Sequence, residues 1–299
     1  MNAQEPTANL TRNAALASVG VSLVLILLKA YASMQTGSVA MLGSLADSGL
    51  DLIASLVTLY GVRLAATPAD PDHRFGHGKA EALAALFQVV LISVSAIGIA
   101  IRAVERFLGG GATANAEYGI GVSLAAIAAT LLLVAYQRRV IARTRSVAIS
   151  ADNIHYQSDL LLNLSVIAAL VLDQYAGLAG ADALFGVAIA LWLGWGAYSA
   201  SNHAIDQLMD REWPEQRRLA FLRLAASHPD AHGVHDLRTR TSGMHDFAQF
   251  HIWVAPEMTV RDAHRVMDEI EARLAAEFPG VEILIHVDPE GHLDTEIVD

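Results

Sequence analysis

Two pairs of metal-type ligands lie inside segments of the chain that are otherwise apolar. Asp47 and Asp51 are four residues apart, and so are His155 and Asp159. A spacing of four places both members of a pair on one face of a helix, one turn apart. Three carboxylates and one imidazole, delivered from two helices, suit a four-coordinate divalent cation. Because acidic side chains inside a bilayer are costly and usually functional, the pattern predicts a membrane protein that moves metal.

Alternative readings exist for these residues. The first pair could form a buried hydrogen-bond cluster, or an ion pair with Lys29 of the preceding apolar segment. His155 alone would be read as a packing histidine, but Asp159 on the same face favours a ligand. Asp152 is either the first contact for an incoming cation or an interfacial carboxylate, and we favour the interface. Because protons compete with metal for the same atoms, His155 is the expected proton acceptor.

A second ligand set lies in a short loop between apolar segments. Asp70, His73 and His77 are close enough in sequence to share a cation, with a fourth position left for water or another group. Asp72 is a rival to Asp70 as the carboxylate ligand. The alternative interpretation is an ordinary polar loop.

A third set of His and Asp residues recurs near the C-terminus, on what read as separate strands and a helix. Its members are His235, His251, His264, His286 and Asp288. Residues two apart on a strand share a face, so the last two point the same way. Such a face predicts a dinuclear divalent metal site. Solvated surface histidine is the alternative, and it is the interpretation we give to His228, His232, His245 and His292.

Composition limits the class of protein. Hydrophobic residues make up 54% of the 299, and charged residues only 17%, against about 25% in a typical soluble domain. The net charge of −11 argues against nucleic acid as a partner, since that needs a basic surface. Without cysteine the chain has no disulfides and no thiolate ligands. The polar N-terminal nine residues lack the pattern of a cleaved signal, so we expect the first helix to be retained.

Six segments are long and apolar enough to span a bilayer. They are approximately residues 13–34, 39–65, 80–107, 117–140, 147–172 and 181–201. Basic residues concentrate in the loop between the second and third segments and in the one between the fourth and fifth. The positive-inside rule places these loops in the cytoplasm, and the even helix count then places both termini there.

The remainder of the chain reads as a small soluble domain. A helix is predicted at residues 214–227, strands at 234–241 and 247–254, a second helix at 259–278 and a third strand at 281–287. The order αββαβ predicts an open-faced α/β sandwich. The predicted fold is therefore an all-α six-helix transmembrane domain (residues 1–208) followed by a cytoplasmic α+β, ferredoxin-like metal-binding domain (residues 209–299).

Taken together, these motifs resemble the cation diffusion facilitator family, in particular its bacterial zinc/iron-efflux branch. The matching pieces are Asp47-xxx-Asp51, His155-xxx-Asp159, Asp70-xx-His73, Gly76-His77-Gly78-Lys79-Ala-Glu81, His235-Asp-Leu-Arg-Thr-Arg240 and Ile285-His286-Val-Asp288-Pro289. The resemblance covers nearly the whole chain.

The resemblance implies a homodimer in the bacterial inner membrane, with a metallochaperone-like cytoplasmic domain. It implies exchange of a divalent metal for protons, with H⁺ as counter-ion, and Lys79 pairing with Asp210 to hold the dimer at the membrane surface. The two-Asp, His-plus-Asp set resembles zinc- and cadmium-handling members, so Zn²⁺ is the expected cargo, with Cd²⁺, Fe²⁺ and Co²⁺ as alternatives. Other functions to weigh are a membrane-anchored metal sensor and a metalloenzyme that uses the cytoplasmic His/Asp cluster.

Overall fold

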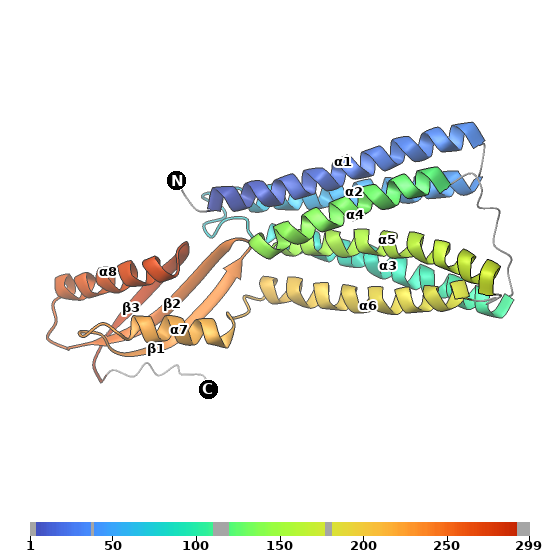
Figure 1. Ribbon diagram of the computed structural model, residues 1–299. Coiled ribbons are helices and arrows are strands. Elements are labelled where there is room, and N and C mark those ends of the chain that lie inside the picture. Colours follow the sequence, from blue (N-terminus) through green and yellow to red (C-terminus); the bar gives the residue numbers. More distant parts are fainter. Residues whose placement is uncertain (1–3, 37–38, 110–119, 177–180, 292–299) are drawn as a thin grey trace. The chain divides into compact units, whose positions relative to one another are not determined.

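The computed structural model describes residues 4–36, 39–109, 120–176 and 181–291. The chain forms two compact units, Met1–Ile205 and Asp206–Asp299. Figure 1 shows long helices in the first unit, and shorter helices with a sheet in the second. This is the predicted fold class, apolar helices followed by an α+β domain.

Long helices account for nearly all of the first unit that the structure describes. They are α1 (Gln4–Thr36), α2 (Val39–Ala65), α3 (Ala80–Gly109), α4 (Ile120–Thr144), α5 (Val147–Ala176) and α6 (Ala181–Leu208). Within the described part of the chain, α1, α2, α3, α4 and α6 are long and apolar enough to cross a membrane. The sequence predicted six such spans; the sixth, α5, continues into side chains outside the described part of the chain, so its span stays a prediction.

Helix α5 is 30 residues long, and its first half is polar whereas its second half is apolar. Asp152, Asn153, His155 and Ser158 lie within seven residues, and all four are buried. They are buried because α5 packs against both α3 and α4. The polar side of this helix is therefore covered by other helices, which is how polar residues are accommodated in membrane proteins.

The second unit contains two helices and a three-stranded sheet. Its elements are α7 (Glu215–Ala225), β1 (His232–Ser242), β2 (His245–Val254), α8 (Val260–Glu277) and β3 (Val281–Pro289). The strand order is β1-β2-β3; β1 and β2 are antiparallel, while β2 and β3 are parallel. A parallel pair needs a crossover connection, and α8 supplies it.

The two faces of this sheet differ. Alternate residues of β2, including Phe250 and Ile252, are buried in a core with Phe221 of α7 and Ile270 of α8. The residues between them, such as His251, point to the opposite face, because neighbouring strand residues alternate in direction. The helices thus cover one face, and the polar side chains gather on the other.

Candidate metal sites

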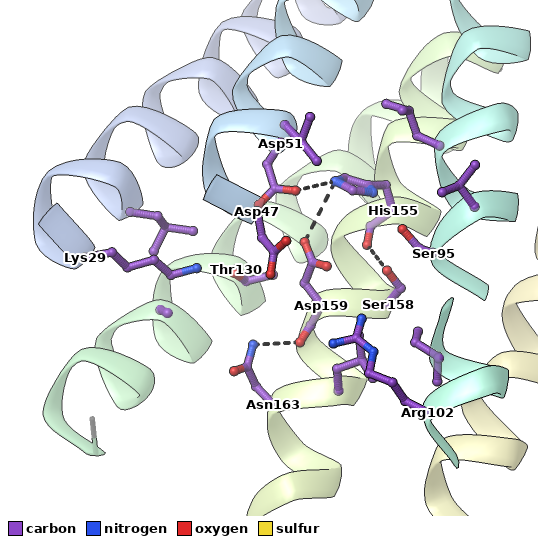
Figure 2. A pocket seen from close by; sticks show the side chains of 17 residues that line it. Lys29, Asp47, Asp51, Ser95, Arg102, Thr130, His155, Ser158, Asp159 and Asn163 are labelled. Carbon is purple, nitrogen blue, oxygen red and sulfur yellow. Dashed lines mark hydrogen bonds and ion pairs between the residues drawn. The ribbon is translucent and has the colours of Figure 1, made fainter. Parts of the chain in front are cut away.

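The second and fifth helices bring three of the four predicted transport ligands together. His155 Nε2 lies 3.0 Å from Asp51 Oδ1 and 3.9 Å from Asp159 Oδ2. One ligand atom from each of the three residues falls within 4.8 Å of the others. Figure 2 shows both acids facing the same nitrogen of the imidazole. This spacing suits side chains that converge on a single cation.

Asp47 is not one of that close group, but it lines the same cavity of about 350 Å³. It lies one turn before Asp51 on α2, and Figure 2 shows its carboxylate facing the same space. Asp47 is exposed, whereas His155 is 6% exposed. The fourth ligand therefore lies toward the open part of the cavity.

Lys29 lines this cavity as well. Its ammonium donates to Ser48 Oγ at 2.6 Å, which places a positive charge next to the two acids of α2. Lys29 therefore lies near the acids of α2, as the ion-pair alternative requires. The three carboxylates nevertheless outnumber the two cationic side chains that line the cavity, Lys29 and Arg102, so the cavity keeps a net attraction for a divalent cation.

The loop set is also brought together. Asp70 Oδ1 lies 3.2 Å from His73 Nδ1, and Asp70 Oδ2 lies 3.3 Å from His77 Nε2. The two imidazole rings are 4.4 Å apart, between centroids. Asp72 donates its backbone N–H to Asp70 at 2.9 Å, and its carboxylate is not part of the close group. The geometry thus favours Asp70 over its rival.

A tight turn shapes this loop. Gly76 has φ of +76°, which suits glycine, and its N–H donates to the carbonyl of His73 at 2.9 Å. The backbone N–H of His73 donates to Asp70 at 2.6 Å and holds the pKa of that carboxyl below its usual range. Asp70 therefore stays ionised, as a metal ligand must.

In the second unit, the register of the sheet aligns three histidines. His251 on β2 lies opposite His235 on β1 and opposite His286 on β3. All three imidazoles lie next to the carboxylate of Asp288. One carboxylate oxygen is 2.9 Å from His251 Nδ1 and 3.6 Å from His235 Nε2, and the other is 3.1 Å from His286 Nε2. Asp288 is only 5% exposed, so its charge lies at the base of the histidine cluster.

Irregular backbone in β1 sets the position of His235. Register shifts occur on both sides of this residue, and Gly233 and Asp236 have φ of +57° and +45°. A Cβ atom at Gly233 would lie 2.4 Å from the ring of Trp253, so glycine is required there. Bulges of this kind re-aim a side chain next to a site.

Two further histidines of this unit, His264 and His228, lie apart from the cluster around Asp288. His264, a predicted ligand, is exposed on α8, where its ring lies 3.3 Å from Asp268. The close group of this unit consists of His235, His251 and Asp288, so both His264 and His286 lie outside it. The reading of His228 as a surface residue was wrong, because it is 4% exposed. Its Nδ1 accepts the N–H of Asp230, and its Nε2 lies 2.9 Å from Glu269, whose pKa this hydrogen bond lowers. His292 lies outside the described residues.

Lys79 and Asp210 belong to different units, and their pairing stays a prediction. Within the second unit, the Asp210 carboxylate lies 3.7 Å from Arg240. Asp210 also has φ of +56° directly after α6.

The sequence reading missed a group of polar residues next to the transport ligands. Ser18, Gln88 and Gln137 all donate to Asp152, at 2.6, 3.1 and 2.7 Å. Asp152 is fully buried, so its assignment to the membrane interface was wrong. The full set, which we call the inner polar cluster, comprises Ser18, Ser22, Ser55, Thr58, Gln88, Gln137, Asp152, Asn153 and Tyr156. Two glutamines in apolar helices were the sequence signal that could have revealed it.

Comparison with known proteins agrees with this organisation. The family model of the cation efflux transmembrane domain matches residues 15–209, and that of the cation efflux protein cytoplasmic domain matches residues 214–290. The cation-efflux pump FieF of Serratia proteamaculans is 41% identical over 282 residues, covering 94% of each chain. FieF of Cronobacter sakazakii is 41% identical over 280 residues, covering 94% of this chain and 93% of the other. A structure of CzrB in its zinc form is 41% identical and covers 28% of this chain and 98% of that one, with a TM-score of 0.26.

A unit of long apolar helices that matches the cation efflux transmembrane domain, followed by an α+β unit that matches the family's cytoplasmic domain, defines a multi-pass transporter of divalent metal cations. The chain belongs to the cation efflux family, the cation diffusion facilitators. The predicted resemblance is thereby confirmed.

Proposed function

We propose that this protein exports divalent metal, with Zn²⁺ as its main cargo, in exchange for protons. The observation that carries the proposal is the close group of Asp51, His155 and Asp159 on a cavity inside the membrane unit. Imidazole and carboxylate are ligands that Zn²⁺ accepts in a tetrahedral site. Fe²⁺, Co²⁺ and Cd²⁺ are alternative cargoes, because donor type and affinity order do not separate them from zinc.

Proton exchange follows from the same atoms. The nitrogen and oxygen atoms that would bind the metal bind protons in its absence, so metal binding and proton binding exclude one another. Protons that enter from the far side would displace the metal there, and metal that enters from the cytoplasm would displace the protons. Alternating access to one site then links the two fluxes.

The proposal also covers the membrane in which the protein lies and its oligomeric state. Basic residues lie in the connections after α2 and α4, which supports an inner-membrane protein with both termini in the cytoplasm. The match to the family's cytoplasmic domain supports a homodimer, in which Lys79 and Asp210 would pair at the membrane surface.

Flux in proteoliposomes tests the proposal. We expect zinc uptake to accelerate when the vesicle lumen is acidic, with protons released in a fixed ratio to zinc, and a series with Fe²⁺, Co²⁺ and Cd²⁺ will rank the cargoes. Zinc binding without flux would indicate a sensor. Hydrolytic turnover without flux would indicate a metalloenzyme. Flux that ignores the pH gradient would contradict proton exchange.

The cytoplasmic histidine cluster leads to a separate prediction. Replacing Asp288 by Asn removes the one charge that contacts His235, His251 and His286, so this unit should lose its metal. At a zinc concentration of 100 times Kd, binding stabilises a fold by about 2.7 kcal/mol, and Asp288→Asn should abolish that gain. The measurement is the zinc-induced rise in Tm together with the number of zinc ions bound per chain. Glu257→Gln, at an exposed carboxylate of the same unit, is the matched control. Equal zinc stoichiometry in Asp288→Asn and wild type would refute the assignment.

A further inference from the structure

The transport ligands divide the membrane unit into two regions of opposite character. On one side lies the cavity, lined by Lys29, Val94, Arg102 and Asn163. On α5, Asn163 is farther than His155 and Asp159 from the α4–α5 connection, and on α3, Arg102 lies near the helix end that is remote from the α2–α3 connection. On the other side, toward those connections, lies the inner polar cluster. The side chain of Asp159 is 33% exposed, whereas Asp152, one turn beyond His155, is 0% exposed. Access to the ligands is therefore from the cavity side alone within the described residues.

The closed side is held by hydrogen bonds between five helices. Asp152 on α5 accepts from Ser18 of α1, Gln88 of α3 and Gln137 of α4. Next to it, the hydroxyl of Tyr156 lies 2.6 Å from Ser22 Oγ of α1 and 2.8 Å from Ser55 Oγ of α2. A hydrophobic contact can slide, but these bonds have fixed directions, so together they define one arrangement of the five helices.

Gln88 is the weak point of this arrangement, because its hydrogen bonds are incomplete. Its Nε2 has two hydrogens but lies within bonding distance of three acceptors: the Ala54 carbonyl, Thr58 Oγ1 and Asp152 Oδ1. Its own Oε1 is buried, with no hydrogen-bond partner among the described residues. The link from α3 to α2 and α5 is therefore incompletely satisfied, which lowers the free-energy cost of breaking it. An incompletely satisfied polar contact is suited to a junction that must open in each cycle.

We propose that Asp152, through its hydrogen bonds with Ser18, Gln88 and Gln137, holds together the helices that separate the metal site from the cytoplasm while the cavity is open on the other side. We call this contact the seal. Asp152 is a positioning residue in this role, because its oxygens are occupied by helix-bridging donors rather than by metal. The inference rests on the proposed transport function. It adds the requirement that these bonds break when the site opens toward the cytoplasm.

The absence of cysteine from the chain provides a direct test. Ser95 lines the cavity on α3, and Ser95→Cys introduces a single, nearly isosteric thiol there. The full-length protein would be placed in metal-free proteoliposomes of known orientation and labelled with a membrane-impermeant methanethiosulfonate reagent from either side. We expect fast labelling from the cavity side and slow labelling from the cytoplasmic side.

Substitutions that weaken the seal should change only the labelling rate from the cytoplasmic side. Asp152→Asn and Gln88→Leu, each in the Ser95→Cys background, should raise the cytoplasmic labelling rate at least tenfold. Ser165→Ala, which removes a hydroxyl that donates to the Leu162 carbonyl within α5, should leave it unchanged. Retained zinc affinity shows that each variant is folded, and Gln88→Leu and Ser18→Ala carry the test if Asp152→Asn does not fold. Unchanged cytoplasmic labelling in folded seal variants would overturn the proposal. The labelling needs neither metal nor a pH gradient, so its outcome is independent of the flux assay.

Discussion

Replacing Asp51 by Asn is expected to lower zinc flux at least 100-fold. The two side chains are nearly the same size, but the amide removes one negative charge 3.0 Å from His155, at the centre of the close group. Two unit charges 4 Å apart interact by about 4 kcal/mol at an effective dielectric constant of 20. Since about 1.4 kcal/mol is a factor of ten in affinity, the loss of this ligand exceeds a 100-fold effect. The measurement is zinc binding by titration, followed by flux in proteoliposomes.

Asp72→Asn is the matched control for this experiment. It makes the same chemical change in an exposed loop carboxylate that lies outside the close groups of ligands. It should leave flux within about twofold of the wild-type value, since exposed surface charges contribute little. Flux through Asp51→Asn at the wild-type rate would show that the metal does not bind where we propose.

The second large effect is expected from His155→Asn, which should weaken the response of zinc binding to pH. In the wild-type protein, protons compete with zinc, so the apparent Kd should rise as pH falls from 8 to 5. Histidine is the side chain whose charge ordinarily changes in this interval. An asparagine cannot take up the proton, so the variant should bind zinc more weakly at pH 8 but lose less affinity on acidification. Its ratio of protons released to zinc taken up should fall by about one.

His203→Asn provides the comparison for this pH experiment. His203 is an exposed residue of α6 whose ring bonds the backbone carbonyl of Ser199, away from the transport ligands. It should show the wild-type pH response and proton ratio. If His155→Asn shows the wild-type response too, the counter-proton is carried by another group.

The sequence predicted which acid and histidine side chains come together, because helical spacing determines which residues share a face. It placed Asp51, His155 and Asp159 on facing helices, and the structure brings their atoms within 4.8 Å. Spacing does not determine depth, however. The polar run at the start of α5 was consistent with either an interface or an interior, and only packing against α3 and α4 made Asp152 a buried residue.

The soluble unit illustrates a different limit. Alternation along a strand predicted that His286 and Asp288 share a face, but not which residues lie opposite them. That depends on the register between strands, which here includes irregular steps on both sides of His235. His228 was misread for a related reason, because the residue that it contacts, Glu269, lies on a helix 41 residues later in the chain.

The polarity of α5 has a consequence for how the protein enters the membrane. An Asp at the centre of a spanning helix disfavours insertion by about 2.5–3.5 kcal/mol, and α5 carries Asp159 near its middle and Asp152 in its second turn. Such a helix inserts poorly by itself and needs partners that are already in the bilayer. Asp152 finds them in Ser18, Gln88 and Gln137, which lie on α1, α3 and α4, while the ligand partner of His155 lies on α2. Each of these partners precedes α5 in the chain, so the ribosome delivers them to the membrane before the helix that depends on them.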